Sequence, residues 1–294
     1  MKDEGRLRRL CGKEFGEQEL GVVRAIVGAS EGCSRAEITR RVCTALGWID
    51  VRGRSKEMGG RVALLRLERR GLIELPAPRN GNANGRRLQW ADVAIAPTQV
   101  LEGSVEQLGR VELTLVRSQA ESRLWHTLIE RYHYLGYCVL SGAQLRYVIR
   151  CEQCVVGAIG FGAAAWKVAV RDRWIGWDAE QRERHLAQVV NNRRLLIAPW
   201  VRVRNLASRL LALAARRVVL DYQHAYGIRP VLLETFVDAQ RYRGTCYRAA
   251  NWLCLGETTG RGRCDRTHTA RSAPKQVLVY PLVAEVRRAL GVQR

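Results

Sequence analysis

The chain has 294 residues, 47% of them hydrophobic, which excludes an intrinsically disordered protein and predicts one large and one small globular domain. Its net charge of +21 points to nucleic acid as the partner; codon preference could explain the predominance of arginine over lysine, but not the shortage of acids. Because no apolar run could span a bilayer and the nine cysteines lack disulfide spacing, we expect a cytoplasmic protein with no membrane partner.

Residues 1–90 predict a winged helix-turn-helix domain. Apolar residues recur at helical spacing over 17–27, and a second helix is expected after Ser34, which suits a helix N-cap. A third helix is expected over 56–70. A strand at 72–75, a turn-rich loop and a returning strand at 88–90 complete the order of a winged helix.

In a winged helix the third helix enters the major groove and the wing contacts the phosphate backbone. The basic residues expected to contact DNA from these two elements are Arg52, Arg54, Lys56, Arg61, Arg66, Arg86 and Arg87. Arginine suits this task because its fork binds phosphate or guanine edges. The alternative is a winged helix that contacts protein. Residues 91–110 are predicted to be a linker.

Residues 111–294 alternate predicted strands and helices, which indicates an α/β (α+β) domain with a twisted mixed sheet covered by helices. A hairpin is expected over 145–161 and a long amphipathic helix over 205–226. The next strand, 231–237, leads into the segment with the most polar side chains of chemical interest.

Two acids, Glu234 and Asp238, are four residues apart and therefore point to one face of that strand. Carboxylates grouped in this way can hold Mg²⁺ or Mn²⁺ for cutting or joining DNA, with Asp178 or Asp265 completing the metal site. The alternative is that the two acids pair with arginines. The arginines considered as partners are Arg194, Arg229, Arg241 and Arg243.

A tyrosine nucleophile offers a second chemistry, because it can form a covalent intermediate with DNA. Tyr242 and Tyr247 are the candidates, and His133 is a candidate general base or metal ligand. The alternatives are a buried Tyr247 with one hydrogen bond and a His133 that only packs. The basic residues expected to bind DNA around these tyrosines are Arg241, Arg243, Arg248, Arg261 and Arg263.

Four segments, LIERYHYLGY, RDRWIGWD, VVNNRRLLIAPWVRVRNLASRLL and ETFVDAQRYRGTCYRAANWLCLGETTGRGRCD, resemble the Druantia protein A (DruA) family. The resemblance extends from about residue 111 to residue 282. That family occurs in an anti-phage defence system and in or beside transposases of insertion elements. The resemblance therefore implies a DNA-related role in a mobile or defence element, without supplying catalytic residues.

The segments PWVRVRNLASRLL and CYRAANWLCLGET also resemble the phosphate loop and the C-terminal motif of the GNAT acetyltransferase fold. This resemblance places Tyr247 at the position of the general acid in that family. We expect no acetyl-CoA binding, however, because Asn205 stands where the family has a glycine, and its side chain hinders close approach of a pyrophosphate to the backbone.

Together these patterns predict a transposase-like protein that recognises duplex DNA and cleaves or transfers DNA strands by endonuclease-type phosphoryl transfer. One alternative is a non-enzymatic DNA-binding subunit of a defence or transposition complex. An acyl-CoA-dependent acyltransferase is the less favoured alternative. Expected partners are duplex DNA, single-stranded DNA as a second option, further copies of the chain, and other proteins encoded by the same element.

Overall fold

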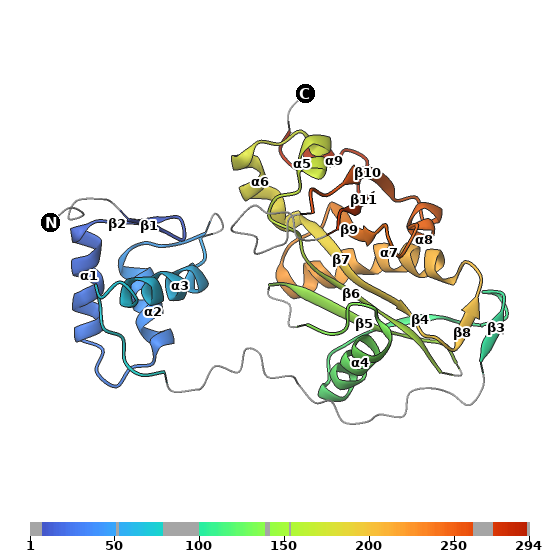
Figure 1. The fold of residues 1–294 in the computed structure, drawn as a ribbon, viewed down its shortest axis with the longest axis horizontal. Coiled ribbons are helices and arrows are strands. Elements are labelled where there is room, and N and C mark those ends of the chain that lie inside the picture. The colour runs from blue at the N-terminus through green and yellow to red at the C-terminus, as the bar shows by residue number, and fades with distance from the viewer. Residues whose placement is uncertain are drawn as a thin grey trace. The chain divides into compact units, whose positions relative to one another are not determined.

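The computed structural model divides the chain into two compact units, residues 1–88 and 89–294, which are coloured along the chain in Figure 1. The residues that it describes are 8–50, 53–78, 100–138, 142–152, 154–260 and 273–292. Within these ranges, no helix combines the length and the apolar character needed to cross a membrane.

The described residues of the N-terminal unit form three helices and a short hairpin. The helices α1 (Glu17–Gly28), α2 (Arg35–Ala45) and α3 (Glu57–Glu68) lie where the apolar spacing predicts them. The hairpin of β1 (Arg8–Leu10) and β2 (Lys13–Phe15) was not predicted. It buries one apolar residue from each strand within an otherwise charged segment, so the sequence offers little strand pattern.

The packing of the helices follows from their caps and small residues. Ser34 Oγ accepts a hydrogen bond from Glu37 N at 3.2 Å, which confirms the predicted start of α2. Gly60 lets α3 approach α2 closely, because a Cβ there would lie 2.7 Å from Cys43 Sγ. Leu64 and Leu67 of α3 are buried in the resulting core.

The predicted wing is not established. Residues 71–78 contain no strand, so the expected strand at 72–75 is wrong, and the returning strand at 88–90 lies outside the described residues. A strand needs a hydrogen-bonded neighbour, and 72–75 has none among the described residues. As far as the structure describes the N-terminal unit, it consists of three helices with a hairpin before the first.

A mixed seven-stranded sheet forms the centre of the C-terminal unit, as the alternating pattern predicts. Its order is β10-β11-β9-β7-β6-β5-β4, and every neighbouring pair is antiparallel except β7 and β9. Its strands are β4 (Glu112–Leu115), β5 (Gln144–Arg150), β6 (Val155–Ala163), β7 (Val189–Ile197), β9 (Leu232–Asp238), β10 (Leu253–Glu257) and β11 (Lys275–Pro281).

A second, parallel pair joins β3 (Leu101–Gly103) to β8 (Val201–Val203). The predicted linker thus ends earlier than expected, because β3 belongs to the C-terminal unit and both Val105 and Leu108 are buried in its core. The first part of that linker, residues 91–99, lies outside the described residues.

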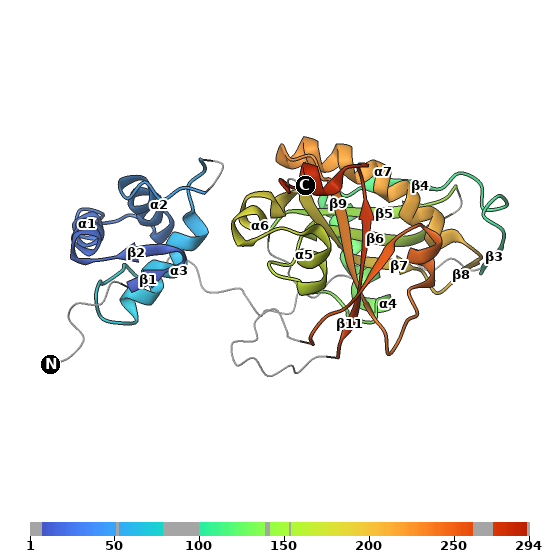
Figure 2. The same ribbon diagram turned by 90° about the horizontal axis from the view of Figure 1, so that it is seen from above.

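Helices α4 (Gln119–Tyr132) and α7 (Leu206–Tyr226) cover opposite faces of the large sheet (Figure 2). From α4, Trp125 Nε1 donates to Ile159 O, whereas Tyr147 OH points to the other face and donates to Asp221 of α7. The remaining helices are α5 (Ala169–Ile175), α6 (Ala179–His185), a 3-10 turn (Leu186–Gln188), α8 (Thr245–Ala249) and α9 (Val286–Ala289).

A bulge in β7 aims its side chains to different faces. Gly160 pairs with Arg194 but the next residue of β6 pairs with Asn192, so Arg193 is the extra residue. Asn192 consequently meets Tyr247 of α8, whereas Arg194 lies on the α4 face and donates to Gly136 O. This bulge and the short parallel pairing of β7 with β9 set the geometry of the candidate site.

Candidate nucleic-acid interface

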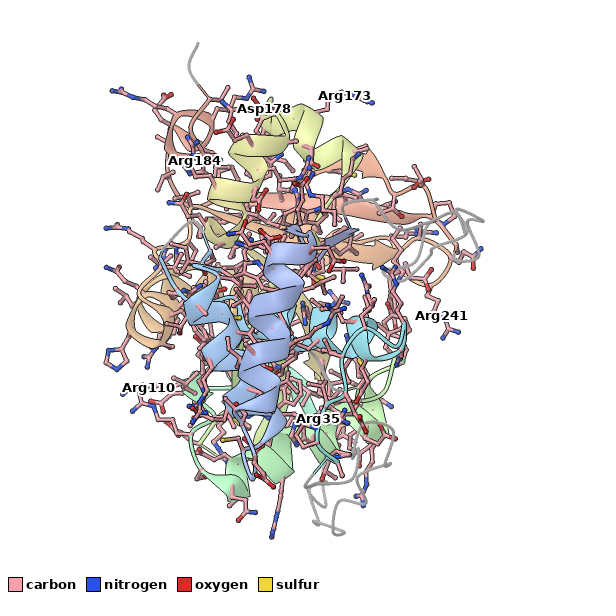
Figure 3. The ribbon with its side chains drawn as sticks, turned by 90° about the vertical axis from the view of Figure 1, so that its left-hand side faces the viewer. Arg35, Arg110, Arg173, Asp178, Arg184 and Arg241 are labelled. Atoms are coloured by element: carbon pink, nitrogen blue, oxygen red, sulfur yellow. The ribbon has the colours of Figure 1, made fainter. Side chains whose placement is uncertain are left out.

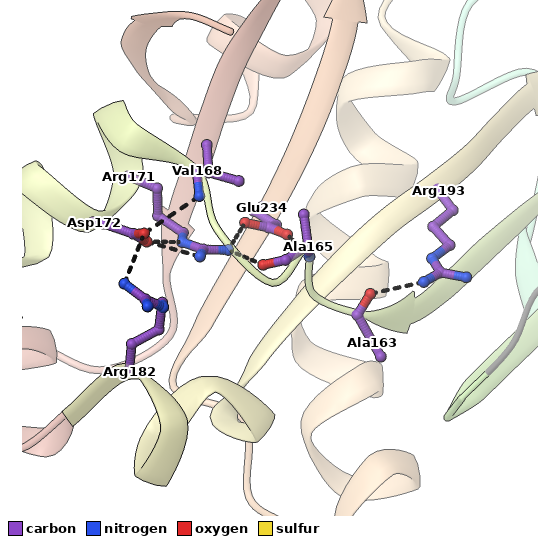
Figure 4. Close-up of polar contacts among 8 residues, drawn as sticks. All are labelled: Ala163, Ala165, Val168, Arg171, Asp172, Arg182, Arg193 and Glu234. Atoms are coloured by element: carbon purple, nitrogen blue, oxygen red, sulfur yellow. Dashed lines mark hydrogen bonds and ion pairs between the residues drawn. The ribbon is translucent and has the colours of Figure 1, made fainter. Parts of the chain in front are cut away.

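Glu234 of β9 lies in a buried ion-pair network (Figure 4). Its Oε2 atom is 2.7 Å from Arg171 Nη1, its Oε1 atom accepts from Ala165 N at 2.8 Å, and both ionic side chains are 0% exposed. Arg171 also donates from Nε and Nη2 to Asp172 Oδ1, at 2.9 and 2.7 Å. Both oxygens of Glu234 are thus engaged, which favours the ion-pair alternative. The partner, Arg171, was not among the expected arginines.

The other acids have separate local roles. Asp238 Oδ2 lies 3.7 Å from Arg241 Nε, one of the expected partners, and Asp178 Oδ1 caps α6 by accepting from Gln181 N at 2.8 Å. Among the residues that the structure describes, no three His, Cys, Asp or Glu side chains form a group that could hold a metal ion. Asp265 lies outside those residues. A metal site at Glu234, Asp238 and Asp178 thus has no geometric support here.

Tyr247 is buried on the α7 side of the sheet. Its hydroxyl donates to Asn192 Oδ1 at 2.7 Å, its ring packs edge-on against Trp252, and burial raises its pKa. A phenol that is buried and already bonded is a poor nucleophile, since ionisation would be unfavourable. The geometry therefore favours the packing alternative for Tyr247.

A half-exposed group of side chains lies on the α4 face, where α4 ends and β9 ends. Tyr134 is at its centre: the Tyr242 ring meets it edge-on at 5.2 Å, the His133 ring stacks on it at 4.9 Å, and Arg241 Cζ lies 5.5 Å from the ring centre. We define the tyrosine cluster as His133, Tyr134, Arg194, Asp238, Arg241 and Tyr242. Three of the five candidate catalytic residues, His133, Asp238 and Tyr242, thus meet here, whereas Tyr134 was missed.

The electrostatics of the tyrosine cluster favour the neutral forms of His133 and Tyr134. Burial, and then the charge of Arg194, lower the pKa of His133 to about 4, and its Nδ1 accepts from Leu135 N at 3.2 Å. Burial, and then the charge of Asp238, raise the pKa of Tyr134. His133 is therefore an uncharged imidazole near pH 7, with one ring nitrogen engaged.

A pocket of about 790 Å³ lies beside the N-terminal half of α7. Ser208, Ala212 and Arg216 contribute to its wall from one face of α7, at intervals of four residues, and Arg204 contributes from the turn just before the helix. Its other lining residues are Gly103 to Gln107, Asn205, Arg209, Ala249 to Asn251 and Tyr280. We call it the arginine pocket. The four-residue spacing could have identified this face from the sequence.

The start of α7 adds a favourable potential for anions. Asn205, the N-cap, has a left-handed backbone with φ of 60°, makes no side-chain cap, and is followed by no acid in the first turn. A long helix carries a partial positive charge at this end. The arginine pocket therefore combines three guanidinium groups with the positive end of α7.

The basic residues of the N-terminal unit that were expected to contact DNA differ in how freely their side chains reach solvent. Arg54 donates from Nε and Nη2 to Asp50 Oδ2, at 3.1 and 3.0 Å, so it is held in its own loop, and Lys56 is half-buried. Arg61 and Arg66 are exposed on α3, on either side of the exposed Met58, Val62 and Leu65. This mixed face leaves both DNA and protein open as partners. Arg52, Arg86 and Arg87 lie outside the described residues.

The C-terminal arginines are largely open to solvent. Arg241, Arg243 and Arg248 are exposed, and Figure 3 shows Arg241 extending away from the ribbon. Arg248 Nη2 donates to Gln276 Oε1 at 3.0 Å, a neutral partner that leaves its charge uncompensated. Arg261 and Arg263 lie outside the described residues.

Comparison with known proteins finds one family: DruA, described as Druantia protein DruA, matches residues 66–273, which is most of the chain. No curated protein matches the chain.

Similar solved structures include two acetyltransferases and an N-acyl amino acid synthase. The aminoglycoside acetyltransferase AAC(6')-Ib with coenzyme A is 13% identical, covers 62% of this chain and 100% of its own, and has a TM-score of 0.39. FeeM, an N-acyl amino acid synthase from uncultured soil microbes, is 12% identical over 59% of this chain and 90% of its own, with a TM-score of 0.36. An N-acetyltransferase from Staphylococcus aureus Mu50 is 7% identical, covers 59% of this chain and 99% of its own, and has a TM-score of 0.37. At identities and TM-scores this low, the three likenesses give no information about the activity of this chain.

Proposed function

Because this chain belongs to the DruA family, we propose that it is a DNA-binding protein of a defence or mobile element, and that its C-terminal unit holds DNA phosphates in the arginine pocket. The observation that carries the proposal is the set of Arg204, Arg209 and Arg216 on one pocket wall. Within the described residues, no salt bridge engages any of the three. Glu106 is the one acid among the lining residues.

Such a wall suits a phosphate chain better than an isolated anion. Arginine donates two parallel hydrogen bonds to a phosphate, and successive guanidinium groups along a helix can follow successive phosphates. Release of the counterions that DNA carries then supplies the free energy of binding. Since these contacts read no bases, sequence recognition would rest on another surface, for which the exposed face of α3 is the candidate.

Strand cleavage or transfer is the second candidate function. For this function, the exposed Tyr242 beside Arg241 favours a covalent tyrosine mechanism over a metal-dependent one. The test is incubation of the full-length protein with end-labelled DNA in magnesium, in manganese and in chelator. A chelator-resistant protein–DNA adduct that is lost in Tyr242→Phe would support a covalent tyrosine mechanism. Metal-dependent products that persist in Tyr242→Phe would contradict it.

The DNA-binding proposal is tested by fluorescence anisotropy with a labelled duplex. The pocket variant replaces Arg204, Arg209 and Arg216 by glutamine. The control variant removes the same charge at three exposed arginines outside the pocket, Arg123, Arg173 and Arg288. We expect the pocket variant to bind at least roughly tenfold more weakly than the control. Equal affinities for the two variants would contradict the proposal.

Coenzyme A serves as a competitor in the same titration, because the pocket at the start of α7 could instead accept a small phosphorylated ligand. Displacement of the duplex by coenzyme A at concentrations where inorganic phosphate has no effect would favour the acyltransferase alternative. No displacement, with duplex binding intact, would support DNA as the ligand.

A further inference from the structure

We propose that the tyrosine cluster binds an unpaired base of single-stranded DNA, with the Tyr242 ring as the stacking surface and Arg241 beside it. This inference rests on the proposed DNA-binding function and adds a second, structurally separate site to it. It assigns single-stranded DNA to the α4 face of the sheet, whereas the arginine pocket borders α7 on the opposite face.

Tyr242 has the features of a contact residue and not of a core residue. It is 49% exposed, and within the described residues its hydroxyl makes no hydrogen bond. Its backbone is nevertheless fixed, because Tyr242 N donates to Asp238 O at 2.9 Å at the end of β9. An exposed aromatic ring held by an ordered turn loses little conformational entropy when it binds a flat ligand.

Tyr134 supports the position of the ring. It meets Tyr242 edge-on at 5.2 Å, while its other contacts, with His133 and with Arg241, fix it in place. The geometry therefore presents a braced aromatic surface at the solvent boundary. A base stacked on such a surface contributes roughly 1–3 kcal/mol to binding.

The charges around the ring favour a nucleotide over a neutral ligand. The exposed Arg241 and Arg243 outnumber Asp238, His133 is neutral, and the buried Arg194 adds a positive charge near Tyr134. The Arg241 side chain is 62% exposed, and its 3.7 Å ion pair with Asp238 is weak enough to yield to a phosphate. Duplex DNA has its bases stacked inside the helix, so an unpaired strand is the form that offers a base to Tyr242.

The experiment measures binding of the full-length protein to a labelled oligothymidylate and, in parallel, to a labelled duplex of the same length. Tyr242→Ala removes the ring, and Tyr242→Phe keeps the ring without the hydroxyl. Leu220→Ala is the control, because Leu220 is an exposed apolar residue of α7 that lies outside the cluster.

We expect Tyr242→Ala to weaken single-strand binding about 5- to 150-fold, which corresponds to the stacking free energy of one base. Tyr242→Phe and Leu220→Ala should stay within about twofold of the unchanged chain, and all variants should keep duplex affinity.

Unchanged single-strand binding by Tyr242→Ala would overturn the inference. A loss in Tyr242→Phe as large as in Tyr242→Ala would also overturn it, since this would assign the effect to the hydroxyl. Equal losses for single strand and duplex in Tyr242→Ala would also overturn it. Absence of duplex binding by the unchanged chain would instead refute the proposed function. The effect of Tyr242→Ala on single-strand binding would still test the inference.

Discussion

Glu234 and Asp238 stand four residues apart on the same face of β9, yet their surroundings differ completely. Glu234 is 0% exposed and pairs with Arg171 at 2.7 Å, whereas Asp238 borders solvent and lies 3.7 Å from an exposed Arg241. Glu234 is part of a buried ion pair, and Asp238 is part of the tyrosine cluster. A shared strand face and a shared charge therefore do not imply a shared site, because depth in the sheet decides which counter-charge each acid meets.

Removing one member of the buried pair should produce the largest effect on stability. Arg171→Met leaves the Glu234 charge buried without its counter-charge, which typically costs about 3–5 kcal/mol of unfolding free energy. The double variant Arg171→Met/Glu234→Gln should recover a substantial part of that loss, since the Glu234 charge is then absent and Asp172 keeps its 3.6 Å ion pair with Arg182. Urea denaturation followed by circular dichroism measures both. A loss below about 1 kcal/mol for Arg171→Met, which is the level of a surface pair, would contradict the assignment of Arg171 and Glu234 to a buried ion pair.

A buried histidine should make stability depend on pH. Burial, and then the charge of Arg146, lower the pKa of His126 to about 4 from the ordinary 6.5, and its Nε2 accepts from Arg146 Nη1 at 2.8 Å. The unfolded chain therefore takes up the proton first as pH falls. The contribution is complete above pH 6.5 and is lost between pH 6.5 and 4, by up to about 3 kcal/mol. In His126→Gln the unfolding free energy should fall less over that range, and an unchanged pH profile would contradict this assignment.

The surface acid should matter much less for stability. Asp238→Asn removes the ion pair with the exposed Arg241. We therefore expect the unfolding free energy to fall by about 0.2–1 kcal/mol in the same denaturation experiment. Because the substitution also removes the one negative charge of the tyrosine cluster, it should leave single-strand binding equal or stronger. Weaker single-strand binding with unchanged stability would show that the carboxylate contributes directly to the ligand site.

The smallest effect is expected at Arg54 in the N-terminal unit. Its guanidinium is held by Asp50, whereas Arg61 is exposed on α3 with no salt bridge among the described residues. Arg54→Gln should therefore change duplex affinity less than Arg61→Gln does, both measured by anisotropy. A larger loss for Arg54→Gln would show that DNA displaces the local ion pair.

The sequence predicted those features that local pattern specifies. Apolar periodicity located α1 to α3 and α7, and the Ser34 cap was confirmed at the atomic level. The wing strand at 72–75 was wrong because short apolar runs do not identify a pairing partner. The β1–β2 hairpin was missed because its six strand residues include few apolar ones.

The buried ion pair and the tyrosine cluster were harder to predict from the sequence, because both depend on contacts between segments that are far apart along the chain. Arg171 of α5 lies 63 residues from Glu234 of β9, and only the packing of α5 against the sheet brings them together. The tyrosine cluster likewise joins His133 and Tyr134 to Arg194 of β7 and to the end of β9. Tyr242 and His133 could be proposed from residue type alone, but Tyr134 at the centre carried no distinguishing motif.

The most direct measurement of the central proposal is the salt dependence of duplex binding by the full-length protein. The logarithm of the association constant is plotted against the logarithm of salt concentration for the unchanged chain, the pocket variant and the charge-matched control. If Arg204, Arg209 and Arg216 each contact a phosphate, the slope of the pocket variant should be shallower by roughly 3, since each contact contributes about 0.9. The control should keep the original slope. Identical slopes for the pocket variant and the control would contradict the assignment of DNA to the arginine pocket.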